Sequence, residues 1–116
     1  MWAGDRSHSV ARALKEFLEF MKKYYADGDV SAREGIYGYT VAQALVQVLK
    51  QCGDNLTREN VMKQAASMKG FRIETLLPGI SVSTGADDYA PLQAVQLQRF
   101  NGKHYELFGQ VISSEN

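Results

Sequence analysis

Few residues of this chain have the types and spacing that catalysis requires. Its two histidines, His8 and His104, stand far apart in the sequence, one near the N-terminus and one beside a predicted turn. Neither has a cysteine, serine or carboxylate at a spacing that would build a catalytic triad or a metal site. We therefore predict two surface histidines, no catalytic residue, no bound metal and no other cofactor.

Three further features with chemical potential have plainer interpretations. Cys52, the single cysteine, excludes an internal disulfide, and its place in an apolar helix indicates a small buried hydrophobe rather than a reactive thiol. Asp87 and Asp88 stand among small polar residues, which indicates a solvated turn more than a cation site. Gly35 and Gly38 bracket a tyrosine but lack the following Lys-Ser/Thr of a phosphate-binding loop. The sequence therefore indicates a protein that is not an enzyme.

Tyr37 and Tyr39 are the better candidates for a binding site. They stand beside glycines directly before an apolar stretch, where the backbone can approach another molecule closely. A tyrosine offers a pocket both an apolar ring and a hydroxyl donor. The alternative is that both rings simply cover the core where a helix begins. Both interpretations stay open, and Tyr37 and Tyr39 are our candidate ligand-binding residues.

Length and composition indicate one ordinary globular domain. The 116 residues are 45% hydrophobic and 22% charged, which suffices for a real core. Thirteen basic and thirteen acidic residues cancel and are scattered, so we expect no nucleic-acid partner. No window approaches the roughly 18 apolar residues of a membrane span. The first residues lack the apolar stretch of a signal peptide, so the chain as written is expected to be neither anchored nor exported.

The stretch from Tyr37 to Gly53 is the element around which the rest is organised. It predicts a helix that is entered through Tyr-Gly-Tyr and ended by the glycine. Its polar residues form one narrow stripe, and the remaining surface is apolar over more than half the circumference. The stripe consists of Gln43, Gln47, Lys50 and Gln51. A helix this apolar belongs in the middle of a protein.

Two further helices are predicted on either side of it. An amphipathic pattern begins at Ser7 or Ser9, either of which is a suitable N-cap, and stops at Gly28, which is free to take the left-handed cap conformation. Thr57 is the expected N-cap of a third helix that runs to about Lys69 and packs antiparallel to the central one. Its apolar residues, expected to be buried, are Val61, Met62, Ala65 and Met68. Residues 1–70 are thus predicted to form three helices.

The remainder is predicted to be irregular and then β-structured. Residues 71–92 form an irregular segment with a short strand at 80–83, where apolar and polar residues alternate. Residues 93–112 form a hairpin around Asn101-Gly102, a dipeptide that favours a two-residue type I′ turn. Neither face of this hairpin is cleanly apolar, so we expect an edge or bridging hairpin rather than a core sheet.

Five segments of the chain resemble, in order and spacing, the solute-binding proteins of ABC importers in the branched-chain amino-acid group. This is the type I periplasmic-binding family, to which leucine-binding proteins belong. The segments are 37–45 (YGYTVAQAL), 17–25 (FLEFMKKYY), 56–66 (LTRENVMKQAA), 77–82 (LPGISV) and 96–103 (QLQRFNGK). No single segment is diagnostic, and the combination is what resembles the family.

The resemblance implies a fold and a function. Such proteins have two α/β lobes that close on a small solute and deliver it to a membrane permease. This chain is similar to the C-terminal part alone, a single partial domain over residues 1–116. The family's ligand-facing side chain before the central helix corresponds most nearly to Tyr37, with Tyr39 second. The implied solute is an amino acid or an aromatic carboxylate, and the implied full-length parent is periplasmic.

What the chain lacks leads to a further expectation. The sheet that the helices of such a lobe cover is missing from this chain, and exposed apolar side chains each forgo roughly 1.5–3 kcal/mol. We therefore expect a homo-oligomer or a domain-swapped dimer, since exchange of identical elements is a low-cost route to burial. The alternative function is a free-standing, non-catalytic helical dimerisation domain that binds no solute.

Overall fold

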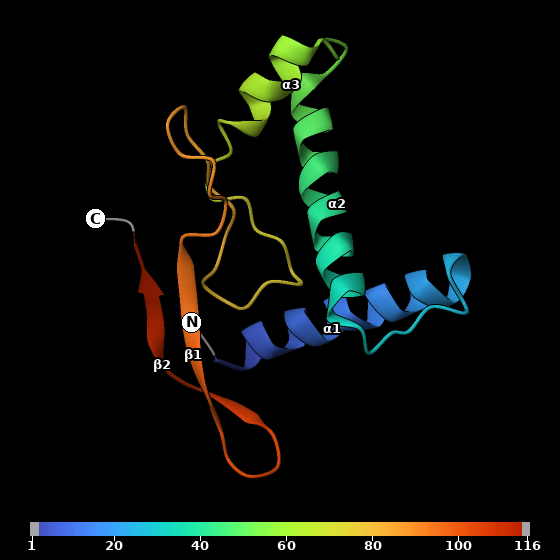
Figure 1. The fold of residues 1–116 in the computed structure, drawn as a ribbon, viewed down its shortest axis with the longest axis vertical. Helices are drawn as coiled ribbons and strands as arrows, with labels where there is room; N and C mark the ends of the chain where they lie inside the picture. Colours follow the sequence, from blue (N-terminus) through green and yellow to red (C-terminus); the bar gives the residue numbers. More distant parts are fainter. Residues whose placement is uncertain (1–2, 115–116) are drawn as a thin grey trace.

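The computed structural model describes residues 3–114, with side chains from residue 10 onward. Three helices precede a two-stranded antiparallel sheet (Figure 1): α1 (Ala3–Tyr24), α2 (Arg33–Cys52), α3 (Arg58–Ala65), β1 (Ala94–Phe100) and β2 (Tyr105–Ser113). The predicted order of three helices followed by a hairpin is confirmed, and the fold contains both helices and strands. Residues 3–114 do not show the two-lobed fold that the resemblance implies.

Helix α1 begins earlier than predicted and buries a narrow face. It starts at Ala3, so Ser7 and Ser9 lie within the helix rather than at its N-cap, and their side chains, like that of His8, are outside the described ones. The buried side chains recur every four residues: Ala13, Phe17 and Met21.

The α1–α2 connection corrects the prediction for Gly28. Its φ angle is not positive, so it is not a left-handed cap. A Cβ atom at Gly28 would instead lie 2.5 Å from the ring of Tyr25 and 2.8 Å from Met21 Cε. The glycine allows a close approach of side chains to the backbone. Gly28 does follow the helix as predicted, but it allows this close approach and does not form a left-handed cap.

Helix α2 begins at Arg33, so Tyr37, Gly38 and Tyr39 lie inside it and not in an entry loop as predicted. Ala32 precedes it in an extended conformation without a side-chain cap, and Glu34 stands in the first turn. Glycine in a helix costs about 1 kcal/mol relative to alanine. At Gly35 a Cβ atom would lie 3.6 Å from Phe17 Cζ, an ordinary van der Waals distance, so the packing there has room for alanine.

The end of α2 and the start of α3 follow the sequence signals. Gly53 ends α2 with φ 58°, and the Thr57 side chain accepts a hydrogen bond from the Asn60 N–H at 3.3 Å. Helix α3 ends at Ala65, earlier than the predicted Lys69. The backbone N–H groups after it bond elsewhere, since Met68 N–H donates to Thr84 Oγ1 at 2.9 Å. The prediction that Met62 is buried is wrong, because it is 59% exposed.

The core lies between α2, the segment after α3 and the irregular segment 71–92. It consists of five buried residues: Val48, Cys52, Met68, Ile73 and Val82. Phe71 and Val82 exchange two backbone hydrogen bonds of 2.9 Å, which fold the segment back on itself. Thr84 Oγ1 donates to Ala65 O at 2.6 Å and so ties this segment to α3. The predicted strand at 80–83 is reduced to the single bridging residue Val82, and Cys52 is buried as predicted.

The hairpin forms as predicted, but its turn lies one residue later. Phe100 pairs with Tyr105, and Gly102 has φ 98°. Asn101 N–H donates to His104 O at 3.0 Å, while Asn101 Oδ1 accepts the His104 N–H at 2.9 Å. Asn101 Oδ1 also accepts the Lys103 N–H at 2.9 Å, the donor that a two-residue turn at Asn101-Gly102 would direct to Phe100 O. No residue of β1 or β2 is buried, which suits the prediction of an edge hairpin.

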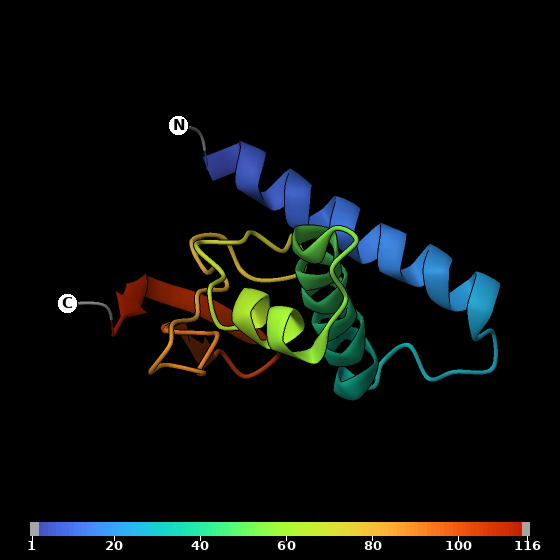
Figure 2. The same ribbon diagram turned by 90° about the horizontal axis from the view of Figure 1, so that it is seen from above.

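The elements are arranged openly. Helix α1 crosses near the N-terminal end of α2, α3 turns back beside the other end, and the hairpin extends away from the helices (Figures 1 and 2). The Cα radius of gyration is 16.2 Å, against about 13 Å for a compact domain of this length. Only Val48 and Cys52 of α2 are buried. The prediction that this helix lies in the middle of the protein is therefore not met by the chain itself.

Candidate functional site

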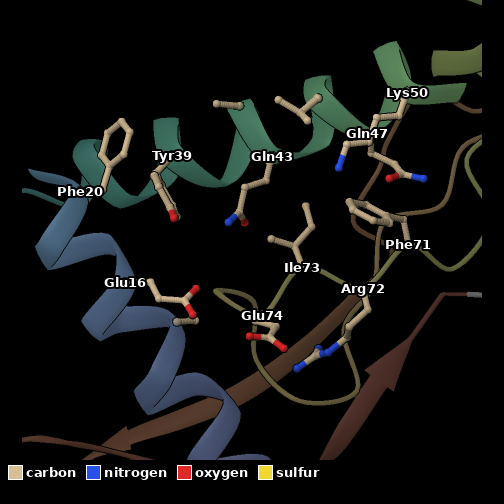
Figure 3. Close-up of a pocket in the computed structure, with 13 residues that line it drawn as sticks. Glu16, Phe20, Tyr39, Gln43, Gln47, Lys50, Phe71, Arg72, Ile73 and Glu74 are labelled. Carbon is tan, nitrogen blue, oxygen red and sulfur yellow. The ribbon is translucent and has the colours of Figure 1, made fainter. Parts of the chain in front are cut away.

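Two hollows lie on different faces of α2, and together they contain both candidate tyrosines. The first, which we call the α1-side pocket, has a volume of about 510 Å³ and lies between α1, α2 and residues 71–74 (Figure 3). Its lining from α2 comprises Tyr39, Ala42, Gln43, Val46, Gln47 and Lys50. Three of the four residues of the predicted polar stripe therefore face this pocket, since positions three and four apart share one side of a helix.

Gln43 is the most informative residue of the α1-side pocket. Its side chain points from α2 into the space in front of Ile73 and Glu74 (Figure 3). Its Oε1 atom is buried and has no hydrogen-bond partner in the part of the chain that the structure describes. A buried acceptor without a donor costs about 1–3 kcal/mol. The α2 wall of the pocket therefore contains one acceptor whose hydrogen bonding the described residues leave incomplete.

The charges on the opposite wall compensate one another. Arg12 donates to Glu74 Oε1 at 2.5 Å and lies 3.9 Å from Glu16 Oε1. The hydrogen bond to Glu74, together with the attraction of its carboxylate, raises the pKa of Arg12 above its ordinary value. Arg72 is engaged by the backbone, donating to Leu77 O at 2.9 Å and to Ile80 O at 3.0 Å. Arg12, Glu16 and Glu74 therefore compensate one another, whereas the Arg72 guanidinium is held in place by backbone carbonyls.

The second hollow, which we call the loop-side groove, has a volume of about 590 Å³ and lies between α2 and the irregular segment. Its floor is mostly apolar, with Val41, Ala44, Ile73, Leu76, Val82 and Leu92 among its lining residues. One polar pair interrupts this surface, where the hydroxyls of Thr40 and Thr75 lie 2.6 Å apart. Thr40 Oγ1 also donates to Ile36 O at 2.8 Å, which fixes its orientation. The groove suits an apolar occupant.

The structure separates the two candidate tyrosines. Tyr37 lines the loop-side groove with its side chain 69% exposed, whereas Tyr39 lines the α1-side pocket. The ring of Tyr39 packs against Phe17 and Phe20, with centroid distances of 5.4 and 5.2 Å. Residues two positions apart on a helix point about 200° apart, and this explains the separation. Both tyrosines stay predicted ligand contacts, but they do not share one site.

Sequence reasoning missed the polar groups that the hollows contain. Gln43 was visible only as one member of a polar stripe, which carried no indication of burial. Thr40 stood in the apolar helix without a partner to suggest a role. Thr75 lies in the irregular segment, and the fold alone brings its hydroxyl to Thr40.

The other chemically suggestive residues lie outside both hollows. Asp88 Oδ1 accepts the Ala90 N–H at 2.9 Å within an exposed turn. His104, at the hairpin tip, has its Nε2 atom 3.4 Å from Glu106 Oε1. Over the described residues, no three His, Cys, Asp or Glu side chains gather where they could hold a metal ion. The hollows are thus the candidate sites.

Within residues 3–114, none of the helices has the length and hydrophobicity of a membrane-spanning segment. Comparison of the chain with protein-family models, with curated proteins and with solved structures gives no match. The hollows and the uncovered apolar surface are accordingly the features from which a function is inferred.

Proposed function

We propose that this chain is the C-terminal part of the solute-binding component of an ABC importer, in the branched-chain amino-acid group. One observation carries the proposal beyond the resemblance. The accessible surface of the chain is 9,077 Å², whereas a compact monomer of 12.9 kDa exposes about 6,300 Å². An incomplete lobe, whose helices await the remainder of a two-lobed protein, has this excess.

The apolar face of α2 that the chain leaves uncovered supports this proposal. Helix α2 exposes large apolar side chains to between 41% and 53%: Val41, Leu45, Val46 and Leu49. Single exposed apolar residues are ordinary, but a contiguous apolar helix face marks an interface. In the proposed parent protein this face is covered by the parallel sheet of the lobe, and the hairpin leads toward the other lobe.

The proposed role is binding without chemistry. The parent encloses an amino acid or an aromatic carboxylate between its lobes and presents it to a membrane permease from the periplasm. Tyr37 is the better placed of the two tyrosines to contact this solute, because its ring and hydroxyl are exposed at the loop-side groove. Tyr39 is already engaged by two aromatic rings, so its part in binding is to support the helix.

The gene that encodes the chain tests this proposal first. An open reading frame that continues upstream of Met1 and encodes a signal peptide and a first lobe is expected. A promoter and an independent start at Met1 would contradict the proposal. The protein encoded by the whole reading frame would then be titrated with L-leucine and with benzoate by calorimetry.

A matched pair of variants sharpens the titration. Tyr37→Ala in that protein is expected to weaken binding of the better probe by about 1–3 kcal/mol, which is the cost of losing a tyrosine contact. Tyr24→Ala is the control, because Tyr24 is 65% exposed on α1 and lies outside both hollows. Equal weakening by both substitutions would contradict the role of Tyr37.

A second candidate function rests on the same excess surface. A free-standing helical interaction domain would use its exposed apolar faces to bind another protein chain and would need no solute. An independent start at Met1, together with no binding of either probe, would favour this candidate. The two candidates therefore give opposite results in the same experiment.

A further inference from the structure

We infer that two copies of this chain associate reciprocally, with the hairpin of each copy docked in the loop-side groove of the other. The docking surface is one face of the hairpin, the hairpin apolar face, formed by Val95, Leu97, Phe108 and Ile112. This inference concerns the 116-residue chain by itself and goes beyond the proposed function. It depends on the area, the geometry and the charges of the two surfaces.

The hairpin apolar face consists of two cross-strand pairs. Val95 is directly opposite Ile112, and Leu97 is directly opposite Phe108, with a register shift of the ladder between the two pairs, and the two side chains of each pair stand on the same side of the sheet. Their exposed fractions lie between 44% and 58%. A two-stranded hairpin is at best marginally stable in water without a packed face. The hairpin therefore gains both burial and order from a surface that covers this face.

The available area exceeds what a stable dimer needs. The chain exposes roughly 2,800 Å² more than a compact monomer of its mass, whereas a standard protein interface buries about 800 Å² on each partner. In a solution of this chain alone, the only other apolar surface of comparable size belongs to a second copy. Burial of the hairpin face and the groove on both copies would use a large part of this excess.

The geometry suits exchange. Pro91 and Leu92 line the groove, and β1 begins at Ala94, so the hairpin follows the groove lining directly in the chain. An element joined to its groove by so short a connection can enter the equivalent groove of a second copy. The contact is then made twice under two-fold symmetry, because each copy supplies one hairpin and one groove.

Each of the two surfaces carries one basic and one acidic side chain. Arg33 and Glu34 lie at the rim of the groove, and Arg99 and Glu106 stand opposite each other on the hairpin face that bears the apolar residues. A docked hairpin can therefore place Arg99 by Glu34 and Glu106 by Arg33. Such rim pairs set orientation more than affinity.

Disulfide trapping tests the contact on the full chain. A Leu97→Cys chain mixed with a Val41→Cys chain is expected to form a disulfide between copies under mild oxidation, since Val41 lines the groove. The matched control replaces Leu97→Cys by Gln98→Cys, which points to the opposite face of the same strand. The natural Cys52 is buried and stays reduced. An equal yield from the control mixture would overturn the proposal.

A single chain that carries both Leu97→Cys and Val41→Cys distinguishes docking of the hairpin on a second copy from docking on its own groove. A cross-link between copies supports the reciprocal dimer. A cross-link within one copy would mean that the hairpin folds over its own groove, and this would overturn the inference.

The mass in solution gives an independent readout. Light scattering behind a sizing column is expected to show twice the chain mass of 12.9 kDa. Phe108→Ser is expected to raise the dissociation constant of the dimer by about 30-fold or more, as for other buried interface anchors. Leu107→Ser, on the opposite face, should change it little. A monomer at all concentrations would overturn this inference but leave the proposed function standing, because the gene and the titration of the whole protein decide that function.

Discussion

The packed region and the hairpin differ in how their side chains are covered. The packed region, which we define as residues 44–92, contains a buried cluster that includes Val48, Ile73 and Val82. The hairpin, residues 94–113, has no buried residue and depends on its own ladder of hydrogen bonds. Both regions have similar proportions of apolar residues. The difference shows that apolar content alone does not make a core, because a core requires faces that meet.

Truncation of a core side chain is expected to lower the free energy of unfolding most. Ile73→Ala should lower the free energy of unfolding by about 2–5 kcal/mol, because Ile73 is 3% exposed and its removal leaves a cavity. Leu107→Ala should lower it by less than about 0.5 kcal/mol, because Leu107 is 51% exposed. Urea denaturation of both variants gives the two values. Similar losses would mean that the hairpin is covered as well as the core.

Loss of a side-chain hydrogen bond to the backbone should also cost more in the packed region than in the hairpin. Thr84→Val removes the bond to Ala65 O at 2.6 Å and the bond from Met68 N–H at 2.9 Å, both half-buried. Its expected cost is about 1–3 kcal/mol, because those backbone groups lose their partner. Gln96→Ala removes the hairpin bond to Gly109 O at 2.8 Å and should cost less than about 1 kcal/mol, since water can replace it. The same denaturation curves measure both, and a larger loss for Gln96→Ala would contradict the comparison.

Two glycines test the place where the regions touch. Gly79 has φ 87° and a Cβ atom there would lie 3.3 Å from Val111 Cγ2 of β2, whereas Gly109 has φ 70° and nothing within 4 Å. Alanine in the left-handed region costs about 1–2 kcal/mol at either position. Gly79→Ala should cost more than Gly109→Ala, because it also crowds Val111. Thermal unfolding of both variants would show equal losses if the contact between the regions did not exist.

The smallest expected effect is a change in the pKa of Asp29, which lies in the α1–α2 connection, outside both the packed region and the hairpin. Hydrogen bonds from the hydroxyl and N–H of Ser31 hold the pKa of Asp29 below its ordinary value of about 3.9. This contribution to stability is present above the pKa of the unfolded state and is lost as pH falls through the lower pKa of the folded state. Ser31→Ala should raise the pKa of Asp29, as measured by NMR titration. An unchanged pKa would contradict this cause.

Local signals in the sequence determined the helices, their order and several of their ends. Thr57 and Gly53 are correct at the boundaries of α3 and α2, because a cap is a contact between neighbours in the chain. The hairpin is correct for the same reason, although the Asn101 side chain moved its turn by one residue. Cys52 was correctly predicted to be buried from the apolar pattern around it.

Tertiary structure alone decided where the candidate site lies. Helix α2 begins at Arg33, so Tyr37 and Tyr39 lie inside it and on different faces, with Gly35 packed against Phe17 of another element. The pairing of Phe71 with Val82 and the meeting of Thr40 with Thr75 join residues far apart in the chain. Such contacts depend on the packing of whole elements, whereas periodicity reports only which side of one element is apolar. The sequence by itself therefore determined the elements, and the fold decided which of their faces are covered.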